Sequence, residues 1–109
     1  MSQTTATIRE LNDSFRKSGA GGKILITDGV GNLEEAMIYQ ILITVFDYDD
    51  FTESNDPYGE HDFGNFKIGG ETIFWKIDYY DNDFKFGSEN PANPEITERV
   101  LTIMLAEEY

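Results

Sequence analysis

Residues 63–80 read FGNFKIGGETIFWKIDYY, and the rest of the predicted fold follows from this stretch. Gly69 and Gly70 suit the two-residue turn of a β-hairpin, because such turns need residues that tolerate a positive φ. The turn fixes the register of the two strands. The predicted cross-strand pairs are Ile68 with Glu71, Phe66 with Ile73, and Gly64 with Trp75. The small Gly64 would leave room beside the indole of Trp75.

A third strand is expected after a second tight turn at Asp81 and Asn82. The resulting register brings aromatic residues together and places an acid opposite a base. Its predicted pairs are Tyr79 with Phe84, Asp78 with Lys85, and Ile77 with Phe86. Residues 63–86 therefore predict an antiparallel meander of three strands. The predicted core residues of this meander are Phe66, Trp75, Ile77 and Phe86.

The chain before the meander begins with a predicted helix and a predicted strand. Residues 5–17 carry Ile8, Leu11 and Phe15 at helical spacing, which predicts an amphipathic helix. Residues 23–27 form a compact β-branched run that is typical of a buried strand.

A second helix is expected from Asn32 to Phe46. Asn32 would cap this helix, and Glu35 three residues later would complete a capping box. Its apolar residues recur at helical spacing and are Ile38, Ile41, Leu42, Val45 and Phe46. The β-branched content of residues 41–45 leaves a strand as the alternative.

Asn93 and Pro94 predict the start of a last helix, because proline is favoured at the first helical position. The buried face of this helix is predicted to comprise Ile96, Val100, Ile103 and Met104. The predicted element order is αβαβββα. We therefore expect one α+β domain over residues 1–109, a small sandwich in which about three helices pack against an antiparallel meander.

The composition is strongly acidic and contains no cysteine. The 109 residues carry a net charge of −13, but fifteen aromatic residues indicate a folded protein rather than a disordered acidic tail. This charge opposes direct binding to nucleic acids and anionic lipids. Thiolate chemistry, disulfides and Cys-ligated zinc are excluded. No stretch is typical of a signal peptide or a membrane span, so a cytoplasmic location is expected.

Residues 24–66 contain ten carboxylates and no Lys or Arg, and seven of the ten lie in residues 47–62. Like charges at this density repel one another unless they are solvated or meet a cation. We predict that this face binds a basic protein. One version of this prediction is that the face mimics nucleic acid and so inhibits a nucleic-acid-binding protein. The predicted docking residues are Asp47, Asp49, Asp50, Glu53, Asp56 and Tyr58. The alternative is a solvated face that only confers solubility.

Glu60, His61 and Asp62 carry the alternative hypothesis of an enzyme. Histidine titrates near neutral pH, so a histidine–carboxylate proton shuttle or a two-carboxylate metal site would suit a hydrolytic or metal-dependent reaction. Adjacent residues on a strand point to opposite faces, which argues against convergence of all three. The structural alternative is a turn at residues 56–59, anchored by Tyr58 and Phe63, with His61 bonded to a nearby carboxylate. A small-molecule-binding module is a third hypothesis.

No metal, cofactor or nucleotide site is predicted. The windows that begin at Asp47 and Asp78 lack the ligand and glycine spacing of an EF-hand. The glycines of residues 19–22 precede a predicted strand and lack the Lys-Ser/Thr ending of a phosphate-binding loop. Clustered carboxylates are expected to bind divalent cations only at about millimolar strength.

Four segments together carry a family resemblance. They are residues 8–13 (IRELND), 55–64 (NDPYGEHDFG), 74–81 (FWKIDYYD) and 100–106 (VLTIMLA). The chain resembles a family of small acidic bacterial proteins that is classed as a domain of unknown function, and the resemblance covers nearly the whole chain. It implies a single-domain bacterial protein. It implies no activity, because the family has no established catalytic or binding residues to carry over.

Overall fold

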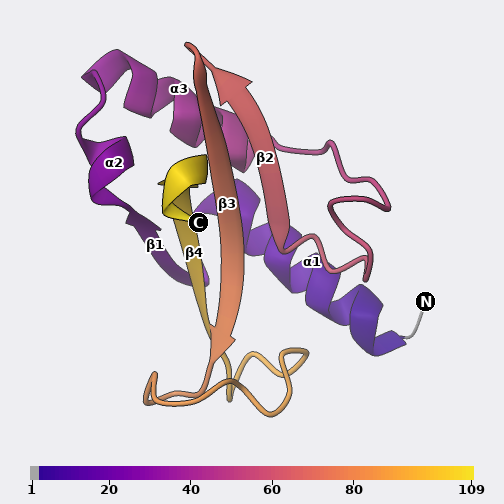
Figure 1. The fold of residues 1–109 in the computed structure, drawn as a ribbon. Helices are drawn as coiled ribbons and strands as arrows, with labels where there is room; N and C mark the ends of the chain where they lie inside the picture. The colour runs from indigo at the N-terminus through magenta and orange to yellow at the C-terminus, as the bar shows by residue number, and fades with distance from the viewer. Residues whose placement is uncertain (1–2) are drawn as a thin grey trace.

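The computed structural model describes residues 3–109 (Figure 1). Its elements are α1 (Gln3–Ser18), β1 (Gly22–Ile26), α2 (Asp28–Gly31), α3 (Glu35–Phe46), β2 (Phe63–Ile68), β3 (Glu71–Tyr80), β4 (Glu98–Leu105) and the 3-10 turn η1 (Ala106–Glu108). The predicted α+β class is confirmed. None of the helices among the described residues has the length and apolar character needed to cross a bilayer.

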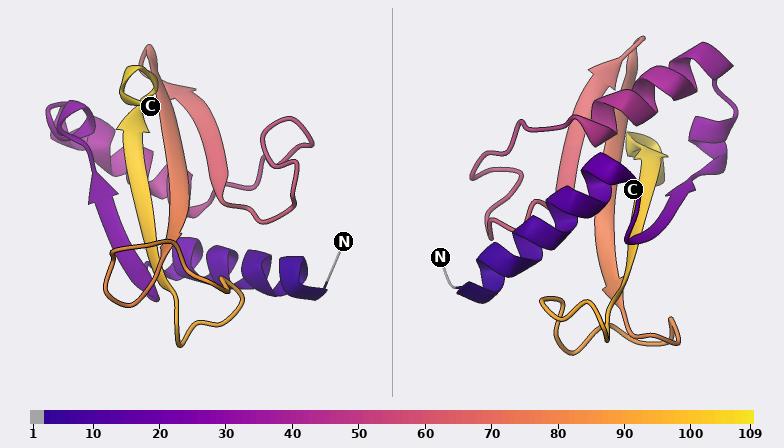
Figure 2. Two further views of the ribbon diagram at one scale, coloured as in Figure 1. Left: turned by 60° about the horizontal axis from the view of Figure 1, so that its bottom comes forward. Right: turned by 180° about the vertical axis from the view of Figure 1, so that it is seen from behind.

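The four strands form one mixed sheet in the order β1-β4-β3-β2. The β2–β3 and β3–β4 pairs are antiparallel, and β1 runs parallel to β4. Helices α1 and α3 cover one face of the sheet, while η1 lies against the other face (Figures 1 and 2). The long loop between α3 and β2 leaves the sheet at the β2 edge (Figure 1). This placement puts the acidic segment beside β2 and leaves β1 at the opposite edge.

The hairpin predicted from Gly69 and Gly70 is confirmed with its register. Both glycines have a positive φ, of 56° and 82°, and the three predicted pairs all occur. Gly64 lies directly against Trp75, because a Cβ at Gly64 would come within 2.5 Å of the indole Nε1. The same Cβ would meet the ring of Tyr48 at 2.7 Å. Only glycine therefore fits between these two rings.

The predicted third strand of the meander and the predicted last helix are both wrong. The neighbour of β3 is β4, which pairs Leu101 with Ile77 and Ile103 with Trp75. The sequence of β4 fits a strand as well as a helix, since its apolar residues satisfy both periods, and its β-branched content favours the strand. Leu101 and Ile103 are fully buried in this arrangement.

The segment predicted to be the third strand is a loop instead. The Asp81 carboxylate accepts hydrogen bonds from the backbone N–H groups of Asp83 and Lys85, at 3.1 and 3.0 Å. These bonds curl the chain into a local turn, and Phe84 has a φ of 57°. Gly87 forms an isolated bridge with Tyr80, and Phe86 is 74% exposed, so the predicted core position of Phe86 is also wrong.

The second helix starts later than predicted. Residues 28–31 form the short helix α2, and Asn32 ends that helix instead of capping the next one. Glu34 occupies the N-cap of α3 without a side-chain hydrogen bond, so the predicted capping box is absent. The helix itself, rather than a strand, is confirmed over residues 35–46.

The core lies between the sheet and the two long helices. Its fully buried side chains include Val30 from α2, Ile41 and Val45 from α3, and Trp75 from β3. The apolar alternation of residues 73–79 is confirmed, since Ile73, Trp75 and Ile77 are buried and their neighbours are not. The core therefore fixes the end of α3, where the acidic loop begins.

Candidate functional site

The acidic loop between α3 and β2 divides into two halves with different surroundings. We define the exposed half by Asp47, Asp49, Asp50 and Glu53, whose side chains lie in solvent. We define the anchored half by Asp56, Glu60, His61 and Asp62, all of which are partly buried. The two halves need separate descriptions, because a carboxylate with a partner inside the protein is not free to recruit one outside.

His61 is held between two carboxylates. Its Nδ1 lies 2.9 Å from Oδ1 of Asp13 on α1, and its Nε2 lies 3.6 Å from Oδ2 of Asp56. The backbone N–H of His61 donates to the other oxygen of Asp56 at 3.0 Å. The imidazole stacks on Phe51 with ring centroids 3.7 Å apart. The predicted bond from His61 to a nearby carboxylate is confirmed.

These contacts restrict what His61 can do chemically. A general base needs one free ring nitrogen within reach of a substrate proton. Both nitrogens of His61 face carboxylates, and one ring face is covered by Phe51. His61 also has a φ of 56°, a conformation that non-glycine residues rarely adopt. Through its contact with Asp13, His61 holds the loop against α1.

A second set of contacts ties Glu60 to the sheet. The Tyr79 hydroxyl donates to Oε1 of Glu60 at 2.8 Å and accepts from Nδ2 of Asn12 at 2.8 Å. Asn12 also donates to the Glu60 carbonyl, and it accepts from Nε of Arg99 at 2.7 Å. Burial and these carboxylate contacts raise the pKa of Tyr79 well above its ordinary value. Asn12 and Arg99 are buried, so this network is part of the interior.

Arg16 lies buried beneath the same loop. It is 1% exposed, donates to Asp13 at 3.1 Å and donates to the Tyr48 carbonyl at 2.8 Å. Its guanidinium lies over the rings of Phe51 and Trp75, at 5.2 and 5.1 Å from their centroids. A cation in this position stabilises the loop both by charge and by stacking.

Asp62 is the carboxylate with the most unfavourable surroundings. Burial raises its pKa to about 6, and the nearby charge of Glu60 acts in the same direction. Its backbone carbonyl accepts from the N–H of Ile77, which fixes the entry into β2. Glu60, His61 and Asp62 therefore have three different environments. Among residues 3–109, no group of three acidic, His or Cys side chains is placed to hold a metal ion.

The exposed half borders an open depression of about 490 Å³. Its rim carries three carboxylates, and its lining comes from the last turn of α3, from the start of the loop and from β2. The lining residues are Ile43, Thr44, Asp47, Tyr48, Asp49, Asp50, Asn65 and Phe66. Asp47 is the C-cap of α3, whose last turn contains no basic residue. A carboxylate at the negative end of a helix dipole is unfavourable, so this end of α3 favours a cation.

Two large apolar side chains lie along the exposed side of α3 and lead to this depression. Tyr39 and Ile43 are 66% and 44% exposed, and with Asp47 they follow one another at a spacing of four residues. Residues at this spacing share one helix face. The solvent face of α3 therefore combines an apolar stripe with an acidic end.

The two remaining residues predicted for docking lie elsewhere. The Asp56 side chain is only 5% exposed and is engaged with His61, so it belongs to the anchored half. Tyr58 is 82% exposed, and thus it does not anchor the turn at residues 56–59 as one alternative expected. The structure brings Asp47, Asp49 and Asp50 together around the depression, but it does not bring all six predicted residues together.

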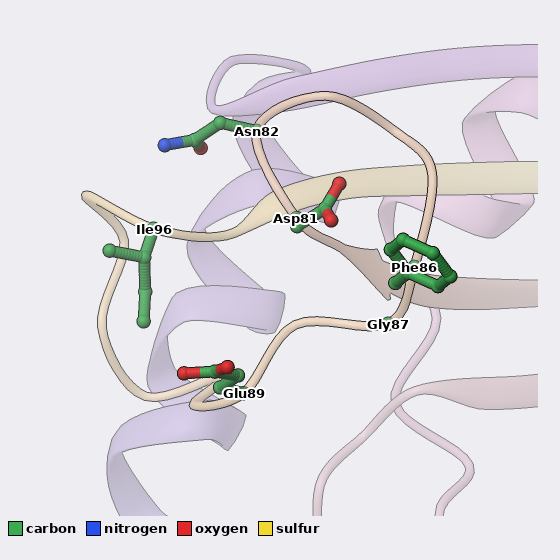
Figure 3. Close-up of a pocket in the computed structure, with 6 residues that line it drawn as sticks. All are labelled: Asp81, Asn82, Phe86, Gly87, Glu89 and Ile96. Carbon is green, nitrogen blue, oxygen red and sulfur yellow. The ribbon is translucent and has the colours of Figure 1, made fainter.

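A second hollow, of about 380 Å³, lies in the loop between β3 and β4 (Figure 3). Its lining residues are Asp81, Asn82, Phe86, Gly87, Glu89 and Ile96. The carboxylates of Asp81 and Glu89 lie apart in this hollow (Figure 3). Asp81 is already occupied by backbone N–H groups. The hollow therefore offers no converging set of polar groups.

The fold and the loop define a small acidic α+β domain with an exposed carboxylate face beside one sheet edge. Residues 26–108 match the family model described as "Protein of unknown function (DUF3768)", so the chain belongs to this family. The match confirms the resemblance to a family of unknown function, although residues 8–13 lie outside it. Comparison with curated proteins and with solved structures found no match.

The residues beneath the loop and the apolar stripe on α3 were not predicted from the sequence. Asn12 and Arg16 lie one turn apart on the same helix face as Ile8, so polar residues within the apolar pattern of α1 were the available signal. For Tyr39 and Ile43 the available signal was the reverse, namely apolar residues that lie outside the buried stripe of α3.

Proposed function

We propose that the exposed half, together with Tyr39 and Ile43 on α3, binds a basic surface on another protein. The observation that carries this proposal is the contrast within the loop. In the anchored half, Asp56 and Glu60 have partners inside the protein and Asp62 is partly buried, whereas no salt bridge among the described residues involves Asp47, Asp49, Asp50 or Glu53. An unpaired anionic face favours a cationic partner.

The depression suits an Arg or Lys side chain. The charged head would meet the carboxylates on the rim, while the aliphatic stem would lie on Ile43 and Phe66. Tyr39 and Ile43 would supply an apolar anchor next to the charges. This combination favours a folded protein partner over a simple polycation.

The partner class that fits best is a protein that binds nucleic acid. Such a protein has a surface of Lys and Arg that is arranged to neutralise phosphates. A domain with a net charge of −13 that occupies this surface would act as a nucleic-acid mimic and as an inhibitor of binding. The enzyme alternative has less support, because Nδ1 of His61 is bonded to Asp13 and Nε2 faces Asp56 at 3.6 Å.

The test compares three forms of the protein as bait in a cell lysate, across a salt series. One variant changes Asp47, Asp49, Asp50 and Glu53 to Asn or Gln. A matched control changes four exposed carboxylates elsewhere, which are Asp83, Glu89, Glu95 and Glu107. We expect capture of basic proteins by the native chain and by the control, with release by salt and by duplex DNA. Capture of basic proteins by all three forms would contradict the proposal. An equal loss of capture in both variants would show that binding depends only on net charge.

A further inference from the structure

The two edges of the sheet differ in how they are closed. At the β2 edge, the Tyr48 hydroxyl accepts from the backbone N–H of Asn65, and the acidic loop lies alongside. At the β1 edge, the N–H of Thr27 donates to the carbonyl of Ile103 on β4. Because backbone groups of a strand alternate in direction, Lys23 and Leu25 also face β4, and Gly22, Ile24 and Ile26 face outward.

The outward groups of β1 have no strand partner in the described part of the chain, since β1 is an edge strand that pairs with β4 on its other side. The strand is also apolar at its surface, with Leu25 52% and Ile26 42% exposed. An unpaired apolar edge is a template for pairing with another strand. Its position is fixed, because Glu108 accepts from Thr27 and from the N–H of Gly29 just after β1.

The charge around β1 identifies the occupant. Residues 14–27 contain no acidic residue, and their exposed basic side chains are Lys17 and Lys23, since Arg16 is buried beneath the acidic loop. Two copies can therefore meet here without opposing their acidic loops, which lie at the other edge of the sheet. We propose that β1 pairs antiparallel with β1 of a second copy, so that the two sheets join into one.

A two-fold axis through Ile24 gives a register that satisfies every outward group. Ile24 pairs with Ile24 of the second copy, and Gly22 pairs with Ile26 of the second copy. This register forms roughly six hydrogen bonds. Lys23 then faces Leu25 of the second copy instead of another Lys23, so like charges do not meet directly. The aliphatic stem of Lys23 covers the exposed Leu25.

This pairing would make the proposed function bivalent. With strands about 4.8 Å apart, the two β2 edges of an eight-stranded sheet lie roughly 34 Å from each other, each beside its own acidic loop. Two linked faces bind a repeated basic surface more tightly than one. The pairing itself does not depend on the proposed function; only its bivalent use does.

The test is sedimentation velocity of the full chain over a protein concentration series, at low and high salt. We expect a dimer that weakens on dilution and strengthens at high salt, because salt screens the repulsion between two anionic copies. Capture of a basic partner has the opposite salt dependence. The exposed-half variant should still dimerise, so the two proposals fail independently.

Two further measurements locate the contact. Ile26→Pro removes an outward N–H without removing a bond to β4, so it should yield a monomer, whereas Ile26→Val should remain dimeric. Hydrogen exchange should show protection that rises with concentration at Gly22, Ile24 and Ile26, with constant protection at Lys23 and Leu25. If Ile26→Pro unfolds the chain, the hydrogen-exchange pattern of the native chain decides by itself whether β1 forms the contact. A monomer at every concentration, open-ended assembly, or concentration-dependent protection at β2 instead would overturn the proposal.

Discussion

The two halves of the acidic loop have the same kind of sequence but different structural roles. Residues 47–53 keep their carboxylates in solvent, whereas in residues 56–62 Asp56 is engaged with His61, Glu60 accepts from Tyr79, and Asp62 is partly buried. Acidic residues that are continuous in sequence can therefore have different structural roles. Which carboxylates are available to a partner depends on the buried cations and amides that the rest of the fold places under the loop.

The largest effect should come from removing the cation buried beneath the loop. Arg16→Ala removes a donor to Asp13 and to the Tyr48 carbonyl and empties a position stacked on Phe51 and Trp75, so stability should fall by about 3 kcal/mol. Denaturant unfolding measures this loss. Lys17→Ala, at an exposed position on the same helix, should change stability by less than about 0.5 kcal/mol. Similar effects of the two changes would show that the buried position of Arg16 does not stabilise the loop.

The next largest effect concerns the packing of Gly64 against Trp75 and Tyr48, beneath the start of the loop. Gly64→Val should lower stability by about 2 kcal/mol, because its side chain would collide with the rings of Trp75 and Tyr48. Thermal unfolding checks this prediction. Lys67→Val, on the same strand and exposed, is the control for a change in β propensity. An unaltered melting temperature for Gly64→Val would contradict the packing described for this strand.

Asp62 gives a smaller effect with a defined pH dependence. Its pKa is about 6 when folded against an ordinary 3.8, so the folded state holds the proton more tightly. The resulting stability is present below about pH 4 and is lost as the pH rises through 6. Asp62→Asn should therefore stabilise the protein by about 1 kcal/mol at pH 7.5, after allowing for solvent screening, and by little at pH 4.

Unfolding curves of Asp62→Asn and the native chain at both pH values test this sign. A stabilisation of equal size at pH 4 would show that the charge of Asp62 is not the cause. Asp49→Asn, in the exposed half, is the matched control and should show no comparable pH dependence, because its side chain is in solvent.

The smallest effect on stability should follow from the exposed half itself. Changing its four carboxylates to Asn or Gln should leave the melting temperature unchanged or slightly higher, because self-repulsion is relieved. A clear loss of stability would mean that these carboxylates have structural partners after all. Differential scanning calorimetry at low salt, where repulsion is strongest, is the appropriate measurement.

The sequence predicted the parts of this fold that depend on local signals. The Gly69-Gly70 turn determined the β2–β3 register, because turn type and alternation act over a few residues. Strand β4 was mistaken for a helix, because Val100, Ile103 and Met104 match helical spacing as well as a strand. Its true neighbours, β1 and β3, are distant in sequence, and only tertiary pairing decides between the two periods.

The site was predicted only as a region. The acidic run and the loop around His61 were visible in the sequence, and so was the bond from His61 to a carboxylate. The identity of that carboxylate, Asp13, was not, because a residue on α1 reaches His61 only through the folded packing of the helix. For the same reason Asp56 was assigned to the docking face, although its side chain points inward.

The central claim is that, within the acidic loop, only the exposed half is free to bind cations, and carbon-detected NMR of the side-chain carboxylates tests it directly. A short arginine-rich peptide would be titrated into the labelled protein while every Asp and Glu signal is followed. We predict shift changes at Asp47, Asp49, Asp50 and Glu53, with little change at Asp56, Glu60 and Asp62 or at the remote Asp83, Glu89, Glu95 and Glu107. Equal changes at all surface carboxylates, or larger changes in the anchored half, would contradict the account.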